Sequence, residues 1–191
     1  LGCGGTIARH ADAGDQVQVL IVAEGATSRL QKRDRLQADE ELSTLAQSAQ
    51  RAGSILGAAG VELLDLPDNR LDSLDRLDLI KRIEQRIDQH QPQVVYVHHA
   101  GDVNVDHRRL HEAVVTACHP TPGHPVKRLL SFKVASSTEW QPPGSASVFQ
   151  PNWFVDISHQ WHRKREALEA YISEIRPWAY HRLLQVLEHF S

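Results

Sequence analysis

Apolar positions along this chain follow two spacings, one typical of buried strands and one typical of amphipathic helices. Short runs rich in β-branched or aromatic residues predict strands, whereas apolar residues recurring every three or four positions predict helices. The predicted strands are residues 16–23, 61–66, 93–97, 127–135 and 153–157. The predicted helices are residues 7–14, 38–56, a segment capped by Ser73 and ended by Pro92, a segment running to about Cys118, and residues 158–175.

The alternation of these strands and helices predicts an α/β fold. Strands joined by helices of this length form a mostly parallel, Rossmann-like sheet with helices on both faces. A chain of 191 residues is long enough to build a single domain with a sizeable core. We therefore predict one α/β domain over residues 1–191.

The start of the chain looks like the middle of a β-loop-α unit. Residues 1–6 are rich in glycine and lead directly into a helical segment, and the chain contains no methionine. We expect a strand upstream of Leu1, so that the sequence begins inside its domain.

Composition limits the partners and the location. The formal net charge is -3, which gives no electrostatic footprint for nucleic acid or an anionic membrane. Two cysteines make no disulfide framework and suit the reducing cytoplasm. No apolar stretch approaches the roughly 20 residues of a membrane span. We expect a cytoplasmic protein with a small-molecule ligand.

Residues 98–108 carry the strongest chemical signal. They hold three imidazoles, two carboxylates and an amide, between a predicted strand and a predicted helix. Open α/β sheets place their ligands at this end of a strand. Neutral imidazole and carboxylate oxygen suit Zn²⁺ and related divalent metals. The cluster therefore predicts a catalytic metal site, to which the polar loops 24–29, 67–70 and 136–140 are expected to contribute from the same rim of the sheet.

Residues 1–14, 24–29, 67–70 and 102–108 together resemble, in order and spacing, the motifs of the PIG-L/LmbE-like zinc-dependent N-deacetylases. The resemblance covers residues 1–178. It implies a metal-dependent hydrolase that removes the N-acetyl group from an N-acetylated amino sugar or sugar conjugate. No G-x-S-x-G serine elbow offers a competing nucleophile.

The resemblance also implies where a metal is held. The family motif Ala-His-Pro-Asp-Asp-Glu, with two metal ligands and the general base, would precede Leu1. The third ligand corresponds to His107. We expect Zn²⁺ or another divalent metal to bind His107 together with upstream residues, and the 191 residues alone to be inactive.

Three further residues are assigned catalytic roles by the resemblance. Asp106 either orients an imidazole or caps the helix. Asn104 stands where many members have histidine, and either donates to a developing oxyanion or holds a turn. His181 is the nearest candidate for the family's C-terminal histidine, in a shifted register.

Candidates for binding the hydroxyls or phosphate of a sugar substrate are Arg29, Asp68, Asn69 and Arg70. Surface loops also carry such residues for solubility alone.

Other histidines remain open as additional contacts. Strand alternation sends the side chains of His98 and His99 to opposite faces, so at most one points into the site. We assign His99 to substrate contact, with metal ligation by either as an alternative. His111 shares the face of His107 and is a weaker candidate ligand.

Two alternatives to an enzyme of this class remain. A catalytically dead sugar-binding or structural relative would explain Asn104 and the absent upstream motif. A nucleotide-binding transferase is disfavoured, because the glycines of residues 1–6 do not match G-x-G-x-x-G.

Overall fold

The structure is a computed structural model that describes residues 2–171. It divides into two compact units, and each is described by itself. The first unit comprises Leu1–Asp68 and Pro151–Ser191, and the second unit comprises Asn69–Gln150.

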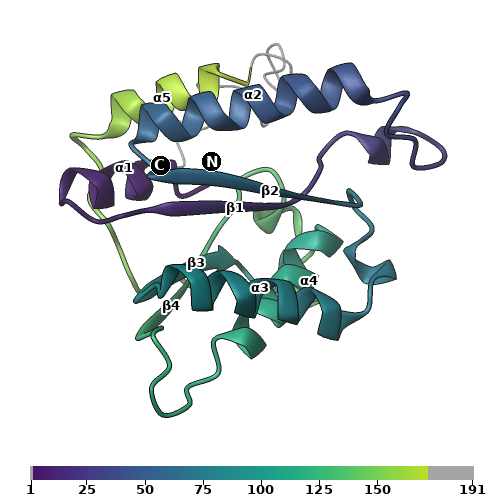
Figure 1. Cartoon of the computed structure of the whole chain (residues 1–191). Coiled ribbons are helices and arrows are strands. Elements are labelled where there is room, and N and C mark those ends of the chain that lie inside the picture. Colours follow the sequence, from purple (N-terminus) through teal and green to yellow (C-terminus); the bar gives the residue numbers. More distant parts are fainter. Residues whose placement is uncertain (1, 172–191) are drawn as a thin grey trace. The chain divides into compact units, whose positions relative to one another are not determined.

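In its described residues, the first unit contains a pair of parallel strands and three α-helices (Figure 1). Its elements are α1 (Gly4–Asp12), β1 (Gln18–Ala23), η1 (Thr27–Arg29), α2 (Asp39–Leu56), β2 (Gly60–Leu66) and α5 (Trp161–Glu169). The register pairs Gln18 with Gly60 and ends with Ala23 opposite Leu66. Helices α2 and α5 lie side by side in Figure 1. Their common core with α1 is made by Ala8, Ala52, Leu56 and Ala167.

Helix α2 shows how local sequence sets the boundaries of an element. Acidic residues occupy its first turn, where they complement the positive end of the helix dipole. Gly57 follows its last residue with φ 77°, a left-handed conformation that glycine adopts without a Cβ penalty. The helix therefore ends at Leu56, and a short turn leads to the start of β2 at Gly60.

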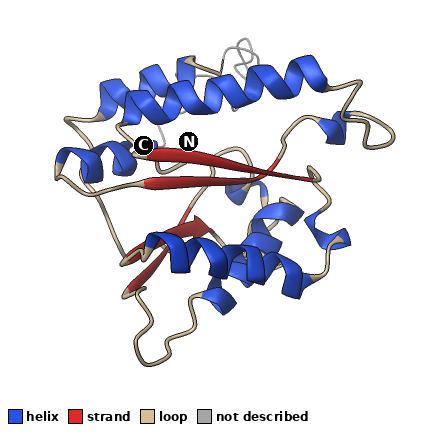
Figure 2. Ribbon diagram, in the orientation of Figure 1, coloured by secondary structure: helices blue, strands red, loops and turns tan. Residues whose placement is uncertain are grey.

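The second unit repeats the strand–helix–strand pattern around another parallel pair, shown in red in Figure 2. Its elements are η2 (Leu71–Ser73), α3 (Arg76–His90), β3 (Val94–His98), α4 (Val105–Ala117), β4 (Arg128–Phe132) and η3 (Thr138–Trp140). Val94 pairs with Arg128 and His98 pairs with Phe132, so both strands end at the same level. Helix α4 packs against α3, which buries Leu79, Ile80, Ile83 and Ile87.

The predicted α/β class and the parallel pairing of strands are confirmed. Strands β1 to β4 lie within or beside the predicted runs. The strand predicted at residues 153–157 is wrong, because that segment pairs with no other strand in the described residues and leaves Trp153 and Phe154 exposed. Asp75, not Ser73, caps α3 by accepting the Leu77 N–H at 2.7 Å.

Among the described helices, none combines the length and the apolarity needed to cross a bilayer.

Candidate active site

Asp102 and His107 form the centre of the candidate site. Asp102 lies in the loop after β3, His107 lies in the first turn of α4, and Asp102 Oδ1 is 3.1 Å from His107 Nδ1. The Asp102 side chain is fully buried, whereas 23 % of the His107 side chain is exposed. A proton on Nδ1 that faces the carboxylate leaves the lone pair on Nε2. Within residues 2–171, Nε2 has no hydrogen-bond partner.

Residues that follow β3 and residues that follow β4 both bind the Asp102 carboxylate. Its Oδ1 accepts the backbone N–H of Asn104 at 2.8 Å. Its Oδ2 accepts the hydroxyl protons of Ser137 at 2.9 Å and Thr138 at 2.7 Å. Burial raises the pKa of Asp102, but hydrogen bonds from His107, Thr138 and Asn104 outweigh it and lower the pKa to about 2. Asp102 is therefore a carboxylate at neutral pH.

Thr138 also connects this carboxylate to the backbone after β4. Its Oγ1 accepts the Val134 N–H at 2.7 Å while donating its own proton to Asp102. The Ser137 Oγ lies 3.3 Å from His107 Nδ1. The β4–η3 segment thus fixes both members of the Asp102–His107 pair.

The ring of His98 lies flat on the ring of His107. Their centroids are 3.9 Å apart and their planes differ by 14°, and Phe132 covers His98 at 4.8 Å. Burial, reinforced by the nearby His107, lowers the pKa of His98 to about 3, so this ring is neutral. His98 Nδ1 is buried without a hydrogen-bond partner in the described residues.

Asn104 caps α4. Its Oδ1 accepts the N–H groups of Asp106 at 2.8 Å and His107 at 3.3 Å. Its Nδ2 donates to Asn69 Oδ1 at 3.0 Å. These contacts correspond to the turn-holding alternative, while a role toward an oxyanion stays a prediction.

Asp106 connects the segment at residues 69–71 to α4. Its carboxylate accepts the N–H groups of Asn69 at 2.7 Å and Leu71 at 2.9 Å. The carboxylate beside the His107 imidazole is that of Asp102. Sequence analysis placed the segments that contain Asp102, Ser137 and Thr138 at the predicted site but assigned these three residues no role. The available signal was the polar residues in the loops that follow two neighbouring parallel strands.

Arg70 lies between the two residues that Asp106 holds. Its guanidinium makes no hydrogen bond or ion pair with the part of the chain that the structure describes. Because Asn69 also contacts Asn104, the backbone at Arg70 is fixed beside the first turn of α4.

His99 turns away from His98 and contacts a later loop. Its Nε2 is 2.8 Å from the Ser147 carbonyl oxygen. His111, the weaker candidate ligand, uses Nδ1 to bind the His98 carbonyl oxygen at 2.8 Å. His98 and His99 therefore have different partners, as the alternation of side chains along a strand predicts.

Arg29 and Asp68 belong to the first unit and are both engaged there. Arg29 pairs with Glu41, and Asp68 accepts the N–H of Ser28 at 3.3 Å as well as its hydroxyl proton. His181 lies outside the described residues.

A buried carboxylate that sequence analysis did not single out lies after β1. Glu24 pairs with Arg33 at 2.9 Å and with Arg35, and accepts the Thr27 hydroxyl proton. Burial raises the pKa of Glu24, but these hydrogen bonds and charges outweigh it and leave the pKa below its ordinary value. The cluster is a charge network within the first unit.

The residues around His107 match part of the metal site that the resemblance implies. The Nδ1 of His107 faces a carboxylate and its Nε2 has no partner within residues 2–171, which is the arrangement typical of a metal-binding histidine. Among residues 2–171, no three His, Cys, Asp or Glu side chains are grouped to hold a metal ion. Among the described residues, the arrangement therefore fits a single metal ligand, which is His107.

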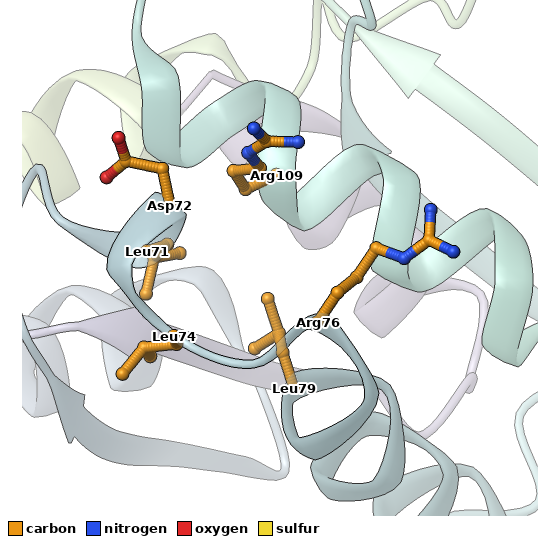
Figure 3. A pocket seen from close by; sticks show the side chains of 6 residues that line it. All are labelled: Leu71, Asp72, Leu74, Arg76, Leu79 and Arg109. Atoms are coloured by element: carbon orange, nitrogen blue, oxygen red, sulfur yellow. The ribbon is translucent and has the colours of Figure 1, made fainter.

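A cavity of about 190 Å³ lies elsewhere in the second unit. Leucines of the η2–α3 segment line it, together with polar side chains from η2, α3 and α4 (Figure 3). Its lining is Leu71, Asp72, Leu74, Arg76, Leu79 and Arg109. Asp102 and His107 are not part of it, so this cavity and the candidate site are separate features.

Comparison with protein families gives one match across most of the chain. The PIG-L model, described as GlcNAc-PI de-N-acetylase, matches residues 1–118. That span includes Asp102, Asn104 and His107.

One relative and two solved structures illustrate the range of similar proteins. The 4-oxalmesaconate hydratase of Pseudomonas putida is 26 % identical, over 93 % of this chain and 70 % of the relative. The structure of 4-carboxy-2-hydroxymuconate hydratase from Pseudomonas putida has a TM-score of 0.70 at 21 % identity, covering 98 % of this chain and 77 % of that one. The N,N'-diacetylchitobiose deacetylase of Pyrococcus horikoshii has a TM-score of 0.67 at 19 % identity, covering 99 % and 68 %. Both structures show that the fold is shared.

Proposed function

Since this chain belongs to the PIG-L family, we propose that it acts as a metal-dependent N-deacetylase on an N-acetylated amino sugar or sugar conjugate. The observation that supports this proposal is the Asp102–His107 pair, in which a buried carboxylate faces Nδ1 and Nε2 makes no contact with the described part of the chain. A cytoplasmic location is part of the proposal and rests on composition alone.

His107 would contribute one metal ligand through Nε2. A carboxylate on the other ring nitrogen fixes the tautomer and raises the basicity of the ligand. Zn²⁺ or another divalent cation, when bound, would polarise the acetamide carbonyl and lower the pKa of a bound water. The stacked, neutral His98 adds no positive charge beside that cation.

The residues around this pair would bind and orient the sugar. Arg70 would donate to a hydroxyl or phosphate of the substrate, with Asn69 beside it. Asp106 would act by holding the backbone of that loop. Arg29, Asp68 and His99 remain proposed substrate contacts, and Asn104 and His181 remain proposed catalytic groups.

A second candidate function is the hydration of an unsaturated carboxylic acid. The observation that favours it is the hydratase that is 26 % identical over 93 % of this chain. The guanidinium of Arg70, which has no partner within residues 2–171, also suits a substrate carboxylate, which arginine binds in a bidentate manner.

The experiment separates these candidates and the binding-only alternative. The natural-length protein with Zn²⁺ is offered N-acetylglucosamine derivatives, with acetate release as the readout, and unsaturated dicarboxylic acids, with loss of ultraviolet absorbance as the readout. Acetate release that disappears in His107→Ala but not in His119→Ala would support the deacetylase. Hydration without acetate release would favour the second candidate, and sugar binding without turnover would indicate a dead relative.

A further inference from the structure

The segment at residues 141–150 returns to the end of β3 and contacts it at two neighbouring residues. The Ser147 carbonyl oxygen lies 2.8 Å from His99 Nε2, and the Phe149 ring meets the His99 ring edge-on with centroids 5.3 Å apart. A Cβ on Gly101 would lie 2.0 Å from the same Ser147 oxygen. Gly101 therefore permits a close approach of backbone that any other residue would prevent.

These contacts hold a segment that has little other support. Residues 141–150 form no helix or strand. Their other hydrogen bonds in the described structure are local, as in Gln141 to Ser145 at 2.6 Å and Ser145 to Pro142 at 2.6 Å. Within the described residues, the hydrogen bond to His99 is therefore the one that connects this segment to a distant part of the chain.

The held segment lies beside the candidate active site. Gly101 directly precedes Asp102, whose carboxylate faces His107. At the other end, Thr138 binds Asp102 just before the segment starts. Residues 141–150 therefore form a loop that begins and returns next to the same carboxylate.

We infer that His99 is a positioning residue that latches residues 141–150 beside the Asp102–His107 pair, where the segment forms an apolar wall of the substrate site. The wall presents Val148, which is 68 % exposed, next to the latched Ser147. A ligand that reaches this wall should carry an apolar substituent on the N-acetylated sugar. This choice of ligand rests on the proposed function, whereas the latch itself does not.

Limited proteolysis tests the latch without any need for activity. Chymotrypsin cleavage after Phe149 is compared with cleavage after the exposed Phe154 of the same chain, by mass spectrometry. In His99→Ala and in Gly101→Ala, cleavage after Phe149 should accelerate about tenfold relative to Phe154, as expected when a local opening loses one hydrogen bond. His119→Ala, which replaces an exposed histidine of the same unit, should leave the ratio unchanged.

The role as a wall is tested by titration calorimetry with two ligands. The natural-length protein should bind the benzyl glycoside of N-acetylglucosamine about tenfold more tightly than the methyl glycoside, because the ring buries apolar area. His99→Ala and Val148→Ser should each abolish that preference, and Val148→Ser should leave the affinity for the methyl glycoside unchanged. Val115→Ser, at an exposed valine of α4, is the matched control.

The outcomes separate the latch from the proposed function. An unchanged cleavage ratio in both His99→Ala and Gly101→Ala would overturn the latch, and circular dichroism confirms that each variant is folded. Faster cleavage with an unchanged benzyl preference would overturn the wall. Failure of both glycosides to bind would remove the proposed function and the wall together, while the proteolysis result would still decide the latch.

Discussion

The imidazole rings of His98 and His107 lie face to face, with centroids 3.9 Å apart and planes inclined by 14°. Phe132 also contacts His98, with the ring centroids 4.8 Å apart and the planes tilted by 48°. The ring of His107 is therefore held by packing on one face and by Asp102 at Nδ1. Its Nε2 has a fixed direction before any ligand arrives.

The stack predicts unequal effects of two substitutions at His98. His98→Ala leaves a gap over His107 and should lower the free energy of unfolding by about 2–3 kcal/mol. His98→Phe keeps a flat ring and removes the unpartnered Nδ1, so the loss should be less than about 1 kcal/mol. Urea unfolding measures both. Equal losses in the two variants would show that the stack contributes little.

The low pKa of His98 predicts a pH dependence of stability. The pKa is about 3 in the folded protein and 6.5 for the ordinary group, so the unfolded chain binds more protons between these values. The free energy of unfolding should therefore fall as the pH is lowered from 6.5 towards 3. Urea unfolding at a series of pH values should show a shallower fall in His98→Phe. An identical slope in that variant would assign the dependence to other groups.

Exchanging carboxylates for amides should distinguish Asp102 from Asp106. Asp102→Asn removes the negative partner of His107 and should weaken zinc binding about 10–100-fold. Asp106→Asn should leave zinc affinity unchanged and instead lower the free energy of unfolding by about 2 kcal/mol, because two backbone N–H groups lose a charged acceptor. Chelator competition and urea unfolding on the natural-length protein measure the two quantities. If Asp106→Asn weakened zinc binding more than Asp102→Asn, Asp106 would be the carboxylate that orients the His107 imidazole.

The hydroxyls after β4 should control the ionisation of Asp102. Ser137→Ala and Thr138→Val each remove one hydrogen bond to Oδ2, so the pKa of Asp102 should rise from about 2 towards its ordinary value. Carbon-13 NMR of the carboxyl group follows this titration. Ser136→Ala, one residue earlier, should have no effect, and a matching shift in that control would contradict a specific role for the hydroxyls.

Sequence periodicity predicted the strands and helices because their apolar faces are locally encoded. The strand predicted at 153–157 failed since β-propensity provides no pairing partner, which only the tertiary structure supplies. Likewise, Ser73 and Asp75 are both good caps, and the η2 turn decides between them.

At the site, the sequence identified the loop and His107 but not the partner of the imidazole. Asp102 lies in the loop after β3 and Asp106 lies four residues later in the first turn of α4, so spacing alone does not separate them. The choice depends on the turn between them, which directs Asp102 to His107 and Asp106 to the backbone of Asn69 and Leu71. Ser137 and Thr138 join Asp102 only because β3 and β4 end level with each other.

Thr138 sets the donor-to-acceptor direction of the hydrogen bonds that reach Asp102 from the segment after β4. Because its one proton goes to Asp102 and its oxygen accepts the Val134 N–H, the chain of donors runs from the peptide group at 134 to the carboxylate. Successive donors in such a chain polarise one another, so the pull on the Asp102 charge exceeds the sum of isolated contacts. The electric field felt by the His107 ring is therefore tuned in part by a peptide bond that never touches it.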